Sequence, residues 1–448
     1  MSLPRRCTGK DGSETFTFKT LTDRMPVILT KVIDQLSRSL NDLVAARGQD
    51  ARAAVKDALS RLTKMKRDLV TDKELPAFED DLPDAKLWGD AVRGMSGLTW
   101  HSAPWLYSEC YMYRAIHSAI ELSPALKGFD PFQVEKEAAF QSALPGMESV
   151  AQFLQTRLQV LDKTRENGDE RDSSIAASLR HLILLSLWGN RVDLCLLSKA
   201  ASNSADEVSS LQTVSQDQIA ELQHMILACD LDQVIAHLQR ARRENDQQQR
   251  RLDIILDNSG FELFTDLCLV HYLLASKSVD CVQLHCKVMP WFVSDSLQKD
   301  VFWTLDRLQE HPLAALSQLG TALREHIDQK RILVTDHVFY TLPYEFSKMT
   351  RVCPDLYTEL QKSYLVILKG DLNYRKLVAD RRWPHTTSFR TGLSGFEPSA
   401  VCTLRTLKAE TVVGLPEGCA EKVAEQDENW LHNGKYGVVQ LLASPDSA

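Results

Sequence analysis

The stretch of the sequence that most constrains the fold is RLDIILDNSGFELFTD, residues 251–266. An apolar run at 254–256 is followed by a polar turn and then by apolar residues at helical spacing. This pattern predicts a buried strand, a tight turn and the start of a helix. Gly260 suits the turn because glycine adopts backbone angles that other residues avoid. We therefore expect a strand–helix unit of an open α/β sheet at this point.

Two polar residues, Asp257 and Asn258, follow the predicted strand directly. Open α/β sheets place their ligands at the carboxyl ends of the strands. Carboxylate and amide oxygens are ligands that Mg²⁺ and Mn²⁺ prefer. A simpler interpretation is that Asn258 and Ser259 only cap the following helix. The spacing alone leaves both interpretations open.

The rest of the chain divides into a helical and an alternating half. Because 448 residues exceed one ordinary core, two or three domains are expected. We predict a flexible arm at 1–24, a mainly helical domain at 25–245 and an α/β/α catalytic domain at 246–448. Polar runs at 201–217 and 240–250 are predicted to be a linker and a solvated connector. The last domain is expected to hold a mostly parallel, Rossmann-like sheet, because helical patterns separate six strand-like runs at 253–256, 282–288, 331–334, 364–368, 401–404 and 436–442.

The composition is that of an ordinary water-soluble protein, with 44% hydrophobic and 25% charged residues. A formal net charge of −8 argues against general nucleic-acid binding. The longest apolar run, at 181–188, is too short to span a bilayer. No CxxC pair occurs among the ten cysteines, so free thiols in a reducing compartment are expected, and with them a cytoplasmic or nuclear location. The closely spaced Cys281, His285 and Cys286 are predicted to be packing residues of a buried strand.

An aromatic-rich stretch at 99–116 carries two charged residues, Glu109 and Arg114. Charges are rarely buried without a partner. We expect that these two residues either line a pocket or pair with each other.

Polar residues follow several of the predicted strands. In a parallel sheet these strand ends share one edge, so the residues are expected to converge there. Oxygen ligands for a divalent cation and a cradle of cations and backbone N–H groups for a phosphate would then lie together. That combination predicts metal-assisted phosphoryl hydrolysis. The residues in question are Asp257, Asn258, Asp295, Lys369, Gly370, Asp371, Asn373, Arg375, Arg405, Thr406 and Lys408.

Five sequence segments together resemble one known family, the damage-control phosphatases. The similarity is to the eukaryotic branch with an RTxK motif, whose animal member is also described as an acidic-residue or protein-glutamate O-methyltransferase. It runs from about residue 20 to the C-terminus. The matching segments are APWLYSECYMYR (103–114), LILLSLWGNRVDLCL (182–196), LDIILDNSGFELFTDL (252–267), ILKGDLNYRKL (367–377) and LRTLK (404–408).

The resemblance implies a helical domain packed on an α/β/α sandwich and a metal-dependent phosphatase site. Its metal ligands and catalytic residues correspond to Asp257, Asn258 and Asp295. The metal is Mn²⁺, Co²⁺, Ni²⁺ or Mg²⁺. The implied substrates are small phosphate esters, in particular fructose 1-phosphate and fructose 6-phosphate, hydrolysed by metal-activated water. The implied substrate-binding residues are Asp371, Leu372, Asn373, Tyr374, Arg375 and Lys408.

Three other functions are open at this stage. The first is a protein-glutamate O-methyltransferase that uses S-adenosylmethionine on a protein substrate. Such enzymes bind their cofactor at a glycine-rich turn, and the chain contains no GxGxG. The second is a haloacid-dehalogenase-type enzyme with a covalent aspartate, which requires an acid where Ser259 stands. The third is a non-catalytic binding module that retains the fold.

Overall fold

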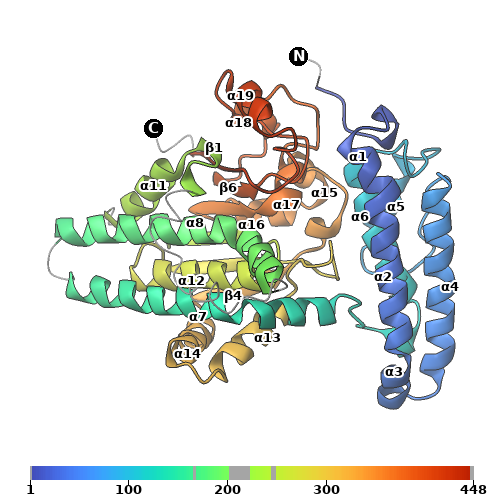
Figure 1. Ribbon diagram of the computed structural model, residues 1–448, viewed down its shortest axis with the longest axis horizontal. Helices are drawn as coiled ribbons and strands as arrows, with labels where there is room; N and C mark the ends of the chain where they lie inside the picture. Colours follow the sequence, from blue (N-terminus) through green and yellow to red (C-terminus); the bar gives the residue numbers. More distant parts are fainter. Residues whose placement is uncertain (1–2, 165–167, 201–221, 244–248, 444–448) are drawn as a thin grey trace.

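The computed structural model describes residues 3–164, 168–200, 222–243 and 249–443. Figure 1 shows an upright bundle of N-terminal helices beside a block in which helices lie along a central sheet. The linker predicted at 201–217 lies outside the described residues, as does the 244–248 part of the predicted connector. No helix in these ranges is long and apolar enough to cross a membrane.

The sheet has seven strands in the order β1-β7-β6-β5-β2-β3-β4. All neighbouring strands are parallel except β6 and β7, which are antiparallel. This confirms the predicted mostly parallel α/β sheet. Six of the strands lie within two residues of the predicted runs at each end, and β1 was not predicted. The strands are β1 (Ile226–Cys229), β2 (Arg251–Ile255), β3 (Cys281–Cys286), β4 (Ile332–Asp336), β5 (Leu365–Lys369), β6 (Ala400–Thr406) and β7 (Gly437–Leu442).

The two faces of the sheet are covered by different helices, because side chains along a strand alternate between faces. Leu365 and Ile367 of β5 pack into one core, and Val366 and Leu368 pack into the other. The first core contains residues of α7 (Gln133–Lys163), α8 (Gly168–Ala200), α11 (Leu231–Arg243), α12 (Phe261–Ala275), α13 (Gln298–Gln309) and α14 (Ala314–Asp328).

The opposite core joins the N-terminal bundle to the other face of the sheet. The 25–245 segment, predicted as one helical domain, is therefore distributed over both faces and supplies β1 to the sheet. A helical pattern shows that a segment has an apolar side but not which surface that side covers. The second core draws on α2 (Met25–Arg38), α3 (Leu40–Arg47), α4 (Asp50–Val70), α5 (Ala85–Arg93), α6 (Trp105–Glu121), α15 (Met349–Val352), α16 (Pro354–Leu360) and α17 (Gly370–Leu377).

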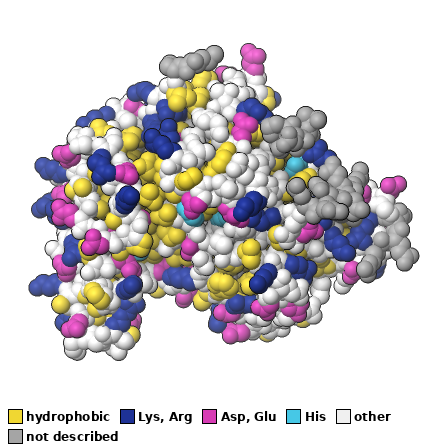
Figure 2. Space-filling model, turned by 180° about the vertical axis from the view of Figure 1, so that it is seen from behind, with side chains coloured by type: hydrophobic (Ala, Val, Ile, Leu, Met, Phe, Trp, Pro, Cys, Tyr) yellow, Lys and Arg dark blue, Asp and Glu magenta, His cyan; other side chains and the backbone are white. Residues whose placement is uncertain are grey.

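A third, smaller core lies under the C-terminal segment, which includes α18 (Phe389–Gly392) and α19 (Cys419–Gln426). On the face seen in Figure 2, basic and acidic side chains are interspersed around hydrophobic ones. That face therefore shows no broad patch of a single charge.

The N-terminal segment is folded against the rest of the chain, in contrast to the flexible arm predicted at 1–24. Its described part includes the helical turns Gly9–Asp11, Phe16–Lys19 and Thr20–Arg24. Phe16 stacks on His432 with ring centroids 4.2 Å apart, and Arg382 pairs with Asp11 at 2.7 Å. These partners are far away in sequence, so the polar composition of the segment gave no indication of them.

Two histidines form a partly buried contact between α12 and α14. His271 Nδ1 lies 3.0 Å from His326 Nε2. Burial and the charge of Arg331 lower the pKa of each imidazole to about 4. The folded protein therefore favours the neutral form of both rings, whereas the unfolded chain accepts protons near pH 6.5.

We predict that the stability of the protein decreases as the pH falls from 7 to 5. The unfolded state binds more protons than the folded state in this range, so protonation favours unfolding. The loss from this pair is expected to be about 2–4 kcal/mol at pH 5. Urea unfolding at both pH values measures it. A double variant, His271→Gln with His326→Gln, should lose most of this dependence, and an unchanged slope would contradict the assignment.

Candidate functional site

The candidate site lies where the order of the strands reverses. β2 continues to β3 and β4 on one side, whereas β5 and β6 lie on its other side. Ligand sites of open α/β sheets form at such a switch point, beyond the carboxyl ends of the strands. Asp257 follows β2 at this point and is 8% exposed. Gly260 has a φ of 72° and turns the chain into α12, as the sequence predicted.

Asp295 comes from a distant segment and meets the β2 turn. Its backbone forms an antiparallel bridge with Asn258. The backbone N–H of Ser296 donates to Asp257 O at 2.8 Å, and that of Ser259 donates to Ser294 O at 2.7 Å. The structure thus brings together the three predicted metal ligands Asp257, Asn258 and Asp295.

These residues belong to an acidic cluster, defined here as the buried carboxylates Asp257, Glu262 and Asp295 together with the partly exposed Asn258. The amide Nδ2 of Asn258 donates to Asp257 Oδ2 at 2.7 Å and to Glu262 Oε2 at 2.8 Å. Burial, followed by the charges of Glu262 and Asp295, raises the pKa of Asp257 well above its usual range. Burial also raises the pKa of Asp295 despite its pair with Lys287 at 3.1 Å. The charged forms of Asp257 and Asp295 are therefore disfavoured in this cluster, with burial as the main cause.

A divalent cation fits this donor set. Burial disfavours the charged forms of two of the carboxylates, and a bound cation would stabilise those charged forms. The Oδ1 atom of Asn258 accepts a hydrogen bond from Ser294 Oγ, so a 180° rotation of the amide would present this oxygen to the cluster. Asp257, Asn258 and Asp295 are the residues that would hold the ion.

The end of β5 lies directly against Asp257. Gly370, the first residue of α17, has a φ of 81°, and a Cβ built there would lie 1.9 Å from Asp257 Oδ2. Asn373 Nδ2 donates to Lys369 O at 2.8 Å and to Leu256 O at 3.2 Å, which fixes the two strand ends to each other. The N–H groups that open α17 therefore begin beside the acidic cluster.

The segment that follows β6 is held by Asp371. This carboxylate accepts from Arg405 Nε at 2.9 Å and from the backbone N–H of Lys408 at 3.1 Å. Burial acts to raise its pKa, but Arg405 and Arg375 outweigh burial and lower it. The positive charge of Lys408 opposes the rise in the pKa of Asp257 that burial and the neighbouring carboxylates cause. Asp371 and Lys408 are thus placed at the same edge of the sheet as the cluster.

The other predicted substrate-binding side chains are engaged elsewhere. Arg375 is buried, pairs with Glu109 at 2.7 Å and with Asp380 at 3.0 Å, and lies 3.6 Å from the ring centre of Trp105. Tyr374 is also buried, donates to Gln440 and accepts from the backbone of Val413. Leu372 is a core residue, and Asn373 bonds backbone carbonyls. Their direct contact with a substrate stays a prediction.

The structure also shows where Glu109, Arg114 and the closely spaced Cys281, His285 and Cys286 lie. Glu109 and Arg114 do not pair with each other, because Arg114 binds Asp80 and Asp84 at 2.7 and 2.8 Å. The strand β3 buries Cys281, His285 and Cys286, as predicted for packing residues. The sequence places Glu109 and Arg114 on the same helix. It does not show which charged residues of other elements pair with them.

Two lysines of the site were not predicted from the sequence. Lys287 follows β3 directly, but the strand-like run predicted at 282–288 included it, so it was not counted among the residues that follow a strand. Its Nζ donates to Leu256 O at 2.8 Å and pairs with Asp295. Lys136, on α7, donates to Asp295 O at 2.9 Å. It lies 159 positions away in sequence, and no local pattern points to it.

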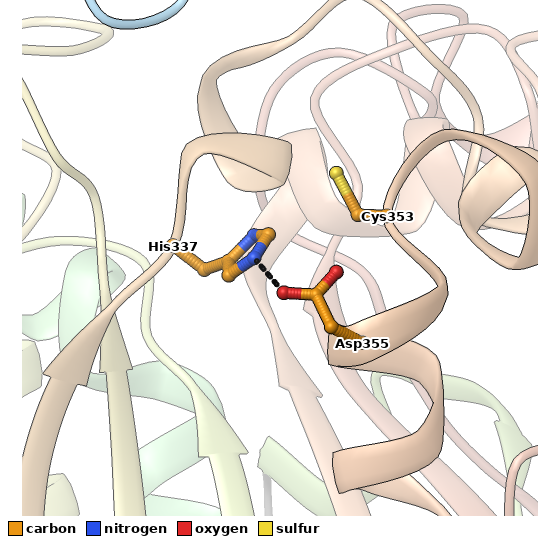
Figure 3. A group of neighbouring side chains, drawn as sticks. All are labelled: His337, Cys353 and Asp355. Atoms are coloured by element: carbon orange, nitrogen blue, oxygen red, sulfur yellow. Dashed lines mark hydrogen bonds and ion pairs between the residues drawn. The ribbon is translucent and has the colours of Figure 1, made fainter.

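A second group of possible metal ligands, His337, Cys353 and Asp355, lies near the end of β4 (Figure 3). Their ligand atoms lie within 4.8 Å of one another. His337 Nδ1 accepts the backbone N–H of Phe339 at 3.1 Å, so in the neutral ring Nε2 carries the proton and donates to Asp355 at 3.3 Å. Burial raises the pKa of the Cys353 thiol to about 11. Because neither the nitrogen nor the sulfur is ready to bind a cation, the acidic cluster is the better candidate.

The mostly parallel α/β sheet has an acidic cluster and cationic side chains at its switch point. This combination is typical of proteins that bind a metal and an anionic ester. The family model of the Damage-control phosphatase ARMT1-like domain matches residues 20–423. The chain belongs to this family, and its membership supports a phosphatase role.

Full-length relatives have similar sequences. The Damage-control phosphatase ARMT1 of Bos taurus is 39% identical over 95% of this chain and 96% of its own length. The proteins of the same name from Danio rerio and Homo sapiens are 38% and 37% identical over 98% of this chain and 97% and 98% of their own lengths. A DUF89 family protein from Pyrococcus horikoshii is 12% identical, with a TM-score of 0.36 over 90% of this chain and 93% of that one, which is too low to establish a common fold.

We predict that Gly370→Ala destabilises the protein far more than Gly395→Ala. Both glycines have positive φ, 81° and 89°, but nothing lies within 4 Å of a Cβ at 395. The control should cost about 1–2 kcal/mol for the left-handed backbone alone. At 370 the clash with Asp257 should add about 1–3 kcal/mol. Urea unfolding measures both, and equal losses would show that β5 and Asp257 are not in close contact.

Proposed function

We propose that this protein is a metal-dependent phosphatase that hydrolyses sugar phosphates such as fructose 1-phosphate and fructose 6-phosphate. The observation that carries the proposal is the convergence of Asp257, Asn258 and Asp295 beyond the end of β2, where burial and neighbouring carboxylates disfavour the charged form of Asp257. Family membership supports the phosphatase role. The substrate class rests on the resemblance of the motifs to the RTxK branch.

The residues around the cluster have separable roles in this proposal. A bound divalent cation supplies a Lewis acid that polarises a phosphoryl oxygen and lowers the pKa of water. Lys408 and the N–H groups that open α17 bind the phosphate. Asp371 holds the backbone of Lys408. Glu262 accepts from Asn258 Nδ2 in the unrotated orientation of the amide and would release it when Oδ1 turns toward the ion. Positive charge at Lys408 also stabilises the negative charge that develops during phosphoryl transfer.

Burial separates these groups from water and strengthens their effect. Glu262 is itself balanced by Lys369 at 3.1 Å, and Lys369 also pairs with Asp266 at 2.7 Å. Burial acts to lower the pKa of Lys369, but Asp266 and Glu262 outweigh burial and raise it. The ammonium therefore stays charged beneath the cluster and fixes α12 relative to β5.

The methyltransferase alternative receives less support. The turn after β2 presents Asp257 and Asn258 and one glycine, Gly260, where S-adenosylmethionine sites use a glycine-rich turn. Release of phosphate from a panel of sugar phosphates, with Mn²⁺, Co²⁺, Ni²⁺ or Mg²⁺ restored to the purified protein, tests the proposal. Methyl transfer from S-adenosylmethionine to glutamate side chains without phosphate release would favour the alternative.

We predict that Asp257→Asn abolishes both metal binding and phosphate release. The substitution keeps the shape of the side chain but removes a ligand charge, so affinity should fall by about 100-fold or more. The metal-free variant should be at least as stable as the parent at pH 7–8, because a buried charge that is disfavoured has been removed. Elemental analysis, calorimetry and thermal unfolding measure these effects.

The matched control is Asp355→Asn, which removes a carboxylate of the His337, Cys353 and Asp355 group. This variant should keep its metal and its activity. Full metal content in Asp257→Asn together with loss in Asp355→Asn would transfer the metal site to that group.

We predict that Lys408→Ala lowers kcat/KM for sugar phosphates and leaves the metal in place. A lost charge-assisted contact to phosphate costs about 1.5–3 kcal/mol, which is roughly a 10–100-fold decrease. The control is Lys422→Ala, on the exposed side of α19. Unchanged kinetics in Lys408→Ala would show that the segment after β6 does not contact the substrate.

A further inference from the structure

The loop that carries Asp295 has an unusual backbone. It joins β3 to α13 and contains two successive residues with positive φ, Phe292 at 41° and Val293 at 72°. Side chains disfavour this region, and a β-branched valine does so strongly. Such a conformation persists only where surrounding contacts enforce it. The position of Asp295, two residues later, therefore depends on what holds the loop.

The N-terminal bundle holds one end of the loop. The Tyr113 ring, on α6, stacks on Phe292 with centroids 4.6 Å apart and planes at 24°. Tyr113 also lies beside Trp291, with centroids 5.8 Å apart, and Trp291 is completely buried. These aromatic contacts fix the strained turn from the side of α6.

Lys136 holds the other end of the loop from α7, which leads away from the bundle along the sheet (Figure 1). Its buried Nζ donates to Asp295 O at 2.9 Å and to Asp300 Oδ2 at 2.7 Å. Asp300 in turn accepts from the backbone N–H of Leu297 at 2.9 Å. One ammonium group therefore bonds the backbone of Asp295 and the first turn of α13 together.

We propose that Lys136 and Tyr113 are positioning residues that set the metal affinity of the acidic cluster. They contribute no ligand, but they hold the backbone of Asp295, which is bridged to Asn258, so that its carboxylate stays near enough to act on Asp257. The inference rests on the proposed function, because the cation is the one proposed there. It assigns to the N-terminal helices a role in the site. Removing either contact lets the strained turn at Phe292 and Val293 relax and shifts Asp295 away from its place opposite Asn258.

The first test separates positioning from charge balance. Lys136→Met alone would leave Asp300 buried without its partner and destabilise the fold. The double variant Lys136→Met with Asp300→Asn removes both charges, and Asp300→Asn alone keeps the bond from Lys136 to Asp295 O. Mn²⁺ affinity measured by calorimetry should fall by about 10–100-fold in the double variant and by far less in Asp300→Asn. Lys31→Met, which breaks an exposed pair with Glu135, is the control and should match the parent.

The second test uses the aromatic contact and does not need the metal. Tyr113→Phe keeps the stacking ring, whereas Tyr113→Ala removes it. Hydrogen exchange of residues 289–297 in the metal-free protein should be faster in Tyr113→Ala and in the Lys136 double variant, and unchanged in Tyr113→Phe. Mn²⁺ affinity should follow the same order. This series remains informative if the Lys136 variants do not fold.

The outcomes distinguish the two proposals. Parent-like Mn²⁺ affinity and exchange in the double variant and in Tyr113→Ala would overturn the positioning role and leave the phosphatase proposal intact. A parent protein that binds no divalent cation at the acidic cluster would overturn the proposed function and the positioning role with it. A uniform loss of stability without a change in affinity would reduce Lys136 and Tyr113 to structural residues and would also overturn the inference.

Discussion

The site depends on the close contact between the ends of β2 and β5. Asp257 follows β2 and lies against the backbone of Gly370, where any side chain would overlap the carboxylate. Asn373 bonds backbone carbonyls of both strand ends. The contact exists because the sheet reverses its order between these strands and because position 370 has no Cβ. It places the carboxylate beside the N–H groups that open α17.

The balance of buried charge is the second constraint. Asp257, Glu262 and Asp295 lie together, and within the described part of the chain Lys287 pairs with Asp295 and Lys369 with Glu262. Burying carboxylates costs free energy unless a cation or donor compensates them. The raised pKa values of Asp257 and Asp295 reflect this cost, which a divalent cation bound beside them would offset. Stability is thus sacrificed at the point where the proposed chemistry takes place.

The N-terminal half does more than cover the sheet. Glu109 of α6 binds Arg375 of α17, and Lys136 of α7 binds the loop that carries Asp295. Each contact joins a helix of this half to a segment that begins or ends at the site. Because Glu109 and Asp300 are buried, removing Arg375 or Lys136 would leave a buried carboxylate without its cationic partner, which costs about 3–5 kcal/mol. The two halves of the chain therefore cannot be considered as independent units.

The sequence by itself determined the mostly parallel α/β sheet, six of its strands and the place of Asp257 and Asn258 after β2. These are local properties. The spacing of apolar residues indicates a strand or a helix, and a glycine between the two indicates the turn. The tertiary structure alone decided that Arg375 pairs with Glu109, that helices of one stretch cover both faces, and that Lys136 holds Asp295. Those outcomes depend on which buried charges and apolar surfaces meet across more than a hundred residues, and periodicity along the chain carries no information about such partners.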